Sequence, residues 1–177
     1  MKKLMIASAI AMSMTAGSAM AALGDAGSQG QVQFLGTIAA KTCDVVVDAN
    51  GAVNNLIQFG RINKGEKVSK PFTVKLKDPT CVQGMTKAHF LWAAPAFTSE
   101  GIGNQSGTAS DSWVRLNAVT GGNTTTQVAN ITSVNNAVTF NIVANKANEG
   151  FKYTAELNAG NELGTFETAA AYSVVYE

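Results

Sequence analysis

The sequence predicts an all-β protein built as a sandwich of two sheets. Three observations support this class. Apolar and polar residues alternate with a period of two in many short segments, and turn-forming residues separate these segments. After residue 21, apolar residues nowhere recur at helical spacing over three turns. Many short strands joined by frequent turns are typical of two packed antiparallel sheets in a single domain.

The first 21 residues predict a secretory signal peptide. Lys2 and Lys3 form a short basic start, residues 4–16 are apolar apart from Ser and Thr, and Ala19, Met20 and Ala21 have the small-x-small pattern of a cleavage site. The apolar stretch is shorter than the roughly 20 residues that a membrane span needs. We therefore expect residues 1–21 to be removed and residues 22–177 to be exported.

The expected strands follow from alternation or from short apolar runs between turns. Val32 and Phe34 alternate with Gln31 and Gln33 in the first strand, and Phe72, Val74 and Leu76 alternate with Thr73, Lys75 and Lys77 in the third. In order along the chain, the expected strands are residues 31–38, 56–60, 72–77, 88–93, 113–118, 136–142, 151–157 and 164–177. Turn-rich pieces such as 121–123 and 158–161 separate them. Their number and spacing favour an immunoglobulin-like sandwich.

The last expected strand is unusual because it is apolar on one face and reaches the last residue of the sequence. Phe166, Ala170, Tyr172, Val174 and Tyr176 occupy the even frame, whereas the odd frame holds Glu167, Ser173 and Glu177. One face is thus built for burial. Terminal strands usually fray, and an apolar strand at a free edge offers unpaired backbone groups to other chains. We therefore expect another segment to cover this edge.

Cys43 and Cys81 predict one structural disulfide. They are the only cysteines, and both lie in the exported part of the chain, where disulfides form. In the chain-entropy account, closing a loop of about 38 residues stabilises the fold by about 4 kcal/mol. A zinc site would need further ligands that no local spacing supplies, and a redox pair usually has the spacing C-x-x-C.

Charge and motifs argue against several functional classes. Removing Lys2 and Lys3 from the 13 basic residues leaves 11, against 12 acidic residues, so nothing in the net charge favours nucleic acid or a membrane surface as a partner. His89, the only histidine, lies in an apolar strand, and no catalytic or phosphate-binding motif is present. We expect no enzyme activity, no cofactor, no metal and no catalytic residue.

One stretch is rich in cations. Six cations fall within seventeen residues, with Glu66 as the only anion among them, namely Arg61, Lys64, Lys67, Lys70, Lys75 and Lys77. The simpler interpretation is a solvated strand protected from mispairing by its charges. The alternative is contact with an anionic glycan of a host cell.

Four features together resemble the pilin subunits of chaperone-usher fimbriae of Gram-negative bacteria. They are the signal peptide, the G-x-V-x-F-x-G segment at residues 30–36, the spaced cysteine pair, and a last strand with Gly164 near its start and Tyr176 next to its end. The resemblance covers essentially the whole mature chain. Residues 151–157 and 164–166 are most similar to major subunits of fimbriae from enterotoxigenic strains.

The resemblance implies an incomplete immunoglobulin-like sandwich that lacks its final strand. A periplasmic chaperone would lend a strand first, and at the outer-membrane usher the N-terminal extension of the next identical or homologous subunit would replace it. The implied domains are a signal peptide at 1–21, an extension at 22–35 that acts as donor strand and leads into the first strand, and a pilin domain at 36–177. The subunit would pass through the periplasm to a fimbria on the cell surface and support adhesion to host cells.

Two sets of residues would form the two halves of this contact. The groove would be lined by Gly164, Phe166, Thr168, Ala170, Tyr172, Val174 and Tyr176, and the donor strand would use Ala22, Leu23, Gly24, Ala26, Ser28, Gly30, Val32 and Phe34. The even-numbered residues of the donor are mostly small and all uncharged, and its large apolar residue near the start, Leu23, lies in the odd frame. Two alternatives follow. Either the donor strand is placed so that Leu23 enters the groove, or Val32 and Phe34 belong partly to the donated segment. The alternative function is a secreted carbohydrate-binding β-sandwich that never polymerises.

Overall fold

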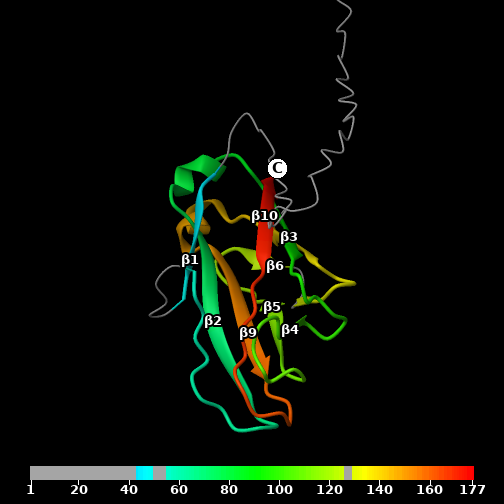
Figure 1. Ribbon diagram of the computed structural model, residues 1–177. Coiled ribbons are helices and arrows are strands. Elements are labelled where there is room, and N and C mark those ends of the chain that lie inside the picture. Colours follow the sequence, from blue (N-terminus) through cyan, green and yellow to red (C-terminus); the bar gives the residue numbers. More distant parts are fainter. Residues whose placement is uncertain (1–42, 50–54, 126–128) are drawn as a thin grey trace, which may run out of the picture. The chain divides into compact units, whose positions relative to one another are not determined.

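Two antiparallel sheets form the described part of this computed structural model, which covers residues 43–49, 55–125 and 129–177, all within one unit of the chain at residues 39–177 (Figure 1). The strands are β1 (Val45–Asp48), β2 (Lys67–Leu76), β3 (Lys87–Ala93), β4 (Ile102–Gly103), β5 (Trp113–Ala118), β6 (Thr124–Thr125), β7 (Ala129–Ile131), β8 (Ala137–Asn141), β9 (Phe151–Asn158) and β10 (Ala171–Tyr176). Two short 3₁₀ helices, η1 (Pro79–Val82) and η2 (Ala144–Glu149), complete the secondary structure. The predicted all-β sandwich is confirmed.

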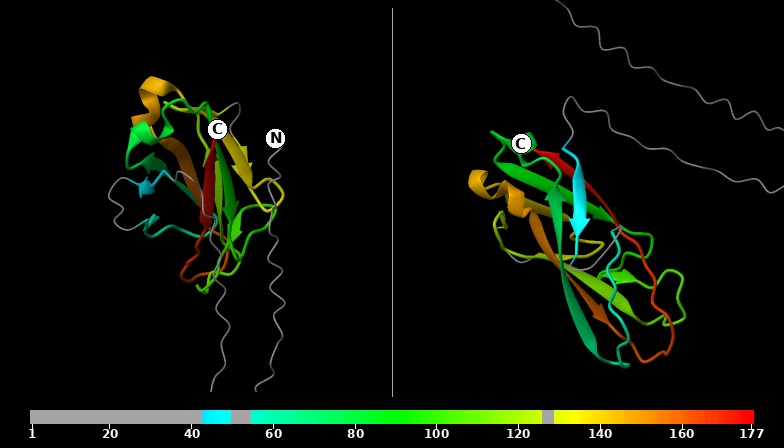
Figure 2. Two further views of the ribbon diagram at one scale, coloured as in Figure 1. Left: turned by 90° about the horizontal axis from the view of Figure 1, so that it is seen from above. Right: turned by 90° about the vertical axis from the view of Figure 1, so that its left-hand side faces the viewer.

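The order of the strands places β1 and β10 at edges of different sheets. The first sheet runs β1-β2-β9-β5-β4, with β7 also paired to β5, and the second runs β10-β3-β8-β6. Each neighbouring pair is antiparallel, and β2 and β9 share the longest register, from Lys67 opposite Asn158 to Val74 opposite Phe151. Figure 2 shows the two sheets from two further sides.

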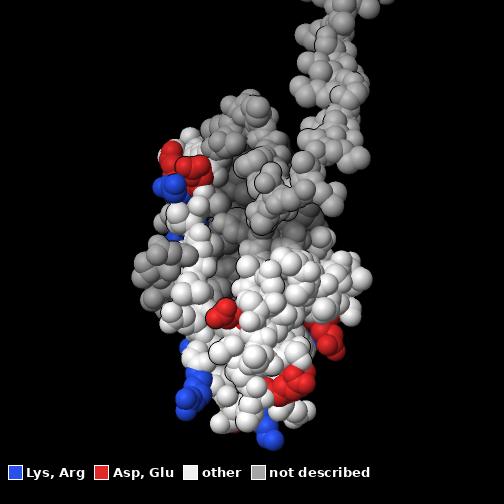
Figure 3. Space-filling view, viewed as in Figure 1, with Lys and Arg blue, Asp and Glu red and all other residues white. Residues whose placement is uncertain are grey.

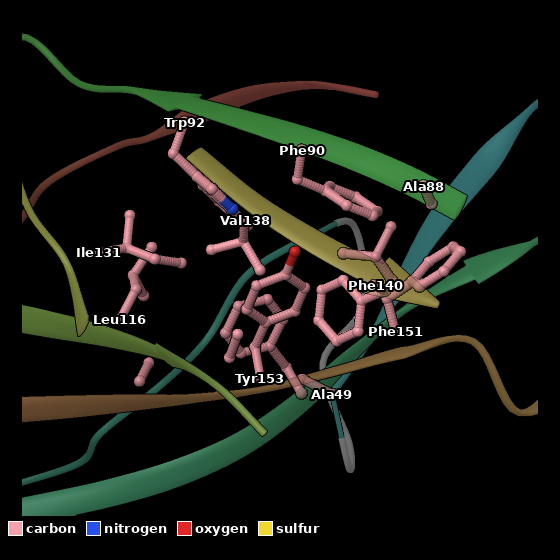
Figure 4. Packing of buried hydrophobic residues seen from close by; sticks show 14 of the residues in the cluster. Ala49, Ala88, Phe90, Trp92, Leu116, Ile131, Val138, Phe140, Phe151 and Tyr153 are labelled. Carbon is pink, nitrogen blue, oxygen red and sulfur yellow. The ribbon is translucent and has the colours of Figure 1, made fainter. Parts of the chain in front are cut away.

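Aromatic side chains from both sheets meet in the core. Tyr153 of β9 stacks on Phe72 of β2 with ring centroids 5.3 Å apart, and its ring meets the edge of Trp92 of β3 at the same distance. Phe90 of β3 contacts Phe151 of β9 at 4.9 Å (Figure 4). Buried aromatic pairs add to the stability gained from apolar burial, so this cluster holds the two sheets face to face.

The disulfide joins the start of the described fold to η1. Cys43 and Cys81 are bonded, with Cα atoms 5.7 Å apart, as predicted. Lys75 of β2 forms an ion pair with Asp48, the last residue of β1. Lys77, just after β2, forms an ion pair with Asp44, just before β1. The backbone of β1 pairs with β2 along its whole length, from Val45 opposite Leu76 to Asp48 opposite Thr73.

Several strand boundaries differ from the sequence prediction. Residues 56–60 were expected to be a strand, but the structure assigns no strand anywhere in 55–66. The third predicted strand begins earlier, at Lys67, and the last one is a paired strand only from Ala171 onward. Residues 56–60 and 166–170 have the alternation of apolar and polar residues that a strand needs. A strand also needs a neighbouring strand to pair with, and among the described residues neither segment has one. The predicted strand at 31–38 lies outside the described residues.

Candidate functional site

The strongest candidate site is the edge of β10, the last strand of the chain. Its burial alternates: the side chains of Tyr172, Val174 and Tyr176 are half-buried, whereas Ala171, Ser173 and Val175 are exposed. Tyr172 contacts Phe90 and Trp92, and Tyr176 contacts Phe151 at a centroid distance of 6.4 Å. The predicted inward frame therefore faces the core, although none of its three members in β10 is fully buried.

The backbone of β10 is paired on one side only within the described part of the chain. The amide N–H of Lys87 donates to the carbonyl of Glu177 at 2.9 Å, and the N–H of Glu177 donates back to Lys87 at 3.1 Å. In an antiparallel pair such doubly bonded residues alternate with residues whose N–H and C=O groups point the other way. Tyr172, Val174 and Tyr176 therefore present their backbone groups to the free edge while their side chains face inward.

A cavity of about 790 Å³ lies between the two sheets at the start of β10, where Ala171 and Tyr172 line it, whereas Val174 and Tyr176 are not part of its lining. The segment 166–172 lines one side, and Val47 of β1 with residues 55–57 and Phe59 line the other. Its floor is apolar and comes from buried core residues, namely Phe72, Trp92, Ile102, Val114, Leu116 and Ala155. The core is therefore open to this cavity.

A second cavity of about 650 Å³ continues toward the turn between residues 60 and 66. It shares Leu56, Ile57, Phe59, Phe166 and Glu167 with the first, so the two form one groove along the open side of the sandwich. Its far end is charged, with Arg61, Lys64 and Glu162 in the lining. Figure 3 shows both signs of charge at this lower end of the described part.

The loop at residues 104–109 holds the stretch that leads into β10. Ala109 N–H donates to the carbonyl of Thr165 at 3.1 Å, and Glu167 N–H donates to Asn104 Oδ1 at 3.0 Å. Gly164 permits this approach, because a Cβ at that position would collide with Thr108. The sequence singled out Gly164, but it gave no role to Asn104 or Thr108, whose partners are about 60 residues away.

One hydroxyl group in the lining of the larger cavity and one on β10 lack hydrogen-bond partners in the described part of the chain. They are the buried Oγ1 of Thr168, which lines the larger cavity, and the buried Oη of Tyr176. Burial raises the pKa of Tyr172, and it raises the pKa of Tyr176 to about 12. Buried polar groups are usually paired in a complete fold, so this edge has unused hydrogen-bonding capacity.

The other predicted residues are not brought into one site. All eight donor-strand residues, from Ala22 to Phe34, lie outside the described residues. The five lysines are spread along and beyond β2, a ten-residue strand about 33 Å long, with Lys64 at the groove end and Lys75 and Lys77 paired to carboxylates at the other. A single cationic patch is therefore not formed by these five side chains, and glycan binding stays a prediction.

His89 lies on the exposed side of β3 and belongs to a small polar cluster. Its Nε2 is 3.2 Å from Glu177 Oε1, which also accepts from Lys87 Nζ at 2.8 Å, and its Nδ1 lies 2.9 Å from Thr139 Oγ1. The hydrogen bond from Lys87, followed by that from His89, lowers the pKa of Glu177. No group of three His, Cys, Asp or Glu side chains in the described ranges could hold a metal ion, and no helix there is long and apolar enough to cross a membrane.

Comparison with known proteins identifies a relative that covers the whole chain. The chain is 39% identical over 181 residues to the F107 fimbrial protein of Escherichia coli, and the alignment covers all of both chains. No protein-family model matches the chain. The chain belongs to the fimbrial subunit family of the chaperone-usher type, as the resemblance in its sequence predicted. It is a structural subunit of a fimbria at the cell surface, where it assembles with other subunits.

Proposed function

We propose that the subunit polymerises by accepting a strand from the next copy into the groove beside β10. The observation that carries this proposal is the combination found at Tyr172, Val174 and Tyr176. Their side chains face the core, and their backbone N–H and C=O groups point to an edge that no described strand pairs. An added strand would form main-chain hydrogen bonds with this edge while its alternate side chains entered the cavity.

The proposed occupant is residues 22–35 of a second copy. Fully extended, these 14 residues reach about 46 Å, whereas the edge from Phe166 to Tyr176 is about 36 Å long. Their even frame contains only small or apolar side chains, and Asp25, the only charged residue of the segment, lies in the odd frame. Because burying an unpaired carboxylate is costly, the even frame faces the groove.

A periplasmic chaperone would occupy the same edge before donation. A subunit whose core opens into a cavity of about 790 Å³ and whose edge strand is paired on one side only is prone to aggregation. A transient strand from a chaperone would protect it during passage through the periplasm, and exchange at the outer-membrane usher would follow. Subunits isolated from the periplasm are therefore expected to be bound one-to-one to a chaperone.

A self-complemented subunit tests the proposal. A copy of residues 22–35, joined after Glu177 through a short flexible linker, should raise the melting temperature by roughly 10–20 °C, as expected if the added strand contributes about 3–5 kcal/mol. The matched control carries Ala26→Asp and Ser28→Asp in the appended copy only and should show little of this gain. Equal melting temperatures for the two fusions would overturn the assignment of the donor.

The alternative of a secreted carbohydrate-binding module makes a different prediction. Strand exchange yields a ladder of oligomers on gels of unheated surface material, and the ladder collapses on boiling. A module that never polymerises yields a single monomer band. Adhesion through Lys64, Lys67 and Lys70 is a separate expectation, and a glycan array with no preference for acidic sugars would remove it.

A further inference from the structure

The exposed side of the second sheet carries an apolar area that strand donation does not use. On β3, β8 and β10 several outward residues are small or apolar, and the polar pair His89 and Thr139 borders them. We call this area the outer apolar face and define it by Leu91, Ala93, Ala137, Ala171, Ser173 and Val175. Leu91 is 50% exposed and Val175 is 65% exposed.

The strand register makes this face continuous. Leu91 lies opposite Ser173 on one side and opposite Ala137 on the other, and Ala93 lies opposite Ala171. Val175 lies opposite His89, which places it diagonal to Leu91 across neighbouring strands and within reach of its side chain. Single exposed apolar residues are common on soluble proteins, but a contiguous apolar area usually marks an interaction site.

The opposite outer side of the sandwich is different in character. There the outward residues of β2, β5 and β9 include Lys75, Arg115, Lys152 and Glu156. The outer apolar face has no charged member, and the nearest charges on its strands, Lys87 and Glu177, are paired with each other at one end. Interface cores are depleted of charged residues, so the contrast singles out one side of the sandwich as a contact surface.

We propose that the outer apolar face packs against a second copy of this chain within the fimbria. This inference rests on the proposed strand donation, because donation sets how near the second copy lies. Between the donor segment, which ends at residue 35, and Cys43, the first described residue, only residues 36–42 intervene. The eight steps from residue 35 to Cys43 span at most about 29 Å, so the body of the donating copy lies within that distance of the groove.

The outer apolar face begins on the same strand that receives the donor. Val175 and Ser173 belong to β10, and Leu91 is one strand further, at a strand spacing of about 5 Å. The face is thus well within the distance that the tether allows. A copy held there would be favoured by burying Leu91 and Val175 without desolvating a charge.

Accessibility of engineered thiols tests this contact. Leu91→Cys and Val175→Cys should react with a maleimide in the self-complemented monomer and at least about tenfold more slowly in assembled fimbriae, because thiol reactivity requires exposure. Ser69→Cys, at an exposed position on the opposite outer side, is the matched control and should react at similar rates in both. Equal rates for Leu91→Cys in monomer and fimbria would overturn the proposal.

A charge variant separates this contact from strand donation. Leu91→Glu should leave the heat-sensitive ladder and the melting temperature of the self-complemented monomer unchanged, but electron microscopy should show fimbriae with altered winding or stiffness. Fimbriae identical to those of the parent would contradict the contact. Loss of the ladder in the parent protein itself would instead contradict strand donation, so the two failures are distinct.

Discussion

The phenol ring of Tyr172 packs against the indole of Trp92, with ring centroids 5.1 Å apart. Trp92 is buried in the core, and both residues line the larger cavity. The pair is therefore shared between the interior of the subunit and the groove in which we place the donated strand. Several consequences of this arrangement can be measured.

Tyr172→Asp should prevent fimbriae from assembling on cells while leaving the disulfide intact. The substitution places a carboxylate among Phe90 and Trp92 and removes their ring contacts, which should cost the self-complemented monomer at least about 3 kcal/mol. Thermal unfolding and surface immunolabelling measure the two effects. Ser173→Asp, on the exposed side of the same strand, should change monomer stability by no more than about 0.5 kcal/mol. Normal fimbriae on cells that carry Tyr172→Asp would show that the groove has another role.

Replacing both Cys43 and Cys81 by Ala should lower the free energy of unfolding by about 4 kcal/mol, since the bond closes a loop with a sequence separation of 38. Denaturant unfolding of the self-complemented monomer measures the change. The control is the self-complemented monomer that keeps both cysteines, unfolded under reducing conditions, and its free energy of unfolding should match that of the double variant. A loss under about 1 kcal/mol would mean that β1 is held mainly by its pairing with β2 and by its ion pairs.

Gly164→Ala should destabilise the stretch that leads into β10. A Cβ at this position meets Thr108, and the backbone there has φ of 158°, which side chains rarely adopt. We expect a loss of roughly 1–3 kcal/mol. Gly103→Ala, where a Cβ would make only ordinary contacts, is the matched control. Equal stabilities would mean that residues 164–167 can move away from the 104–109 loop at little cost.

Alkaline pH should unfold the subunit through its tyrosines. Burial raises the pKa of Tyr172, and it raises the pKa of Tyr176 to about 12. The folded state therefore favours the neutral forms of both tyrosines. Stability from these groups is complete below the ordinary pKa of about 10 and is lost as the pH rises through the folded values. Tyrosinate absorbance should therefore rise together with unfolding, above pH 10. Tyr176→Phe should shift this unfolding to higher pH, and ionisation of all three tyrosines near pH 10 in the folded protein would contradict the expectation.

Acid should weaken the end of β10. The pKa of Glu177 is lowered first by the hydrogen bond from Lys87 and then by that from His89, so the carboxylate stabilises the fold above its ordinary pKa of about 4.3. This contribution disappears as the pH falls through the lowered folded pKa. Protection of the β10 amides from hydrogen exchange, measured relative to the intrinsic exchange rate at each pH, should fall below pH 4.5 in the parent protein. Glu177→Gln should already show the lower protection at neutral pH, and identical protection profiles for the two proteins would exclude a role for the cluster.

The sequence by itself determined which side of several long strands is apolar and the identity of the apolar edge. Alternation in residues 72–77 and 171–176 set which side chains face the core, because the two sides of a strand are fixed by a period of two. The two exported cysteines likewise had only each other as partners. Alternation is a local property of a segment, and the number of cysteines can be counted in the sequence. Neither requires knowledge of contacts between distant parts of the chain.

Only the tertiary structure decided where pairing stops and which surfaces remain open. Residues 56–60 have the pattern of a strand, yet they line a cavity, because strand formation requires a neighbour that local sequence does not specify. Asn104 and Thr108 support the last strand from far along the chain, and the lysines that are close in sequence are separated along β2. The outer apolar face also depends on register, since Leu91 and Val175 are 84 positions apart and become neighbours only when β3 pairs with β10.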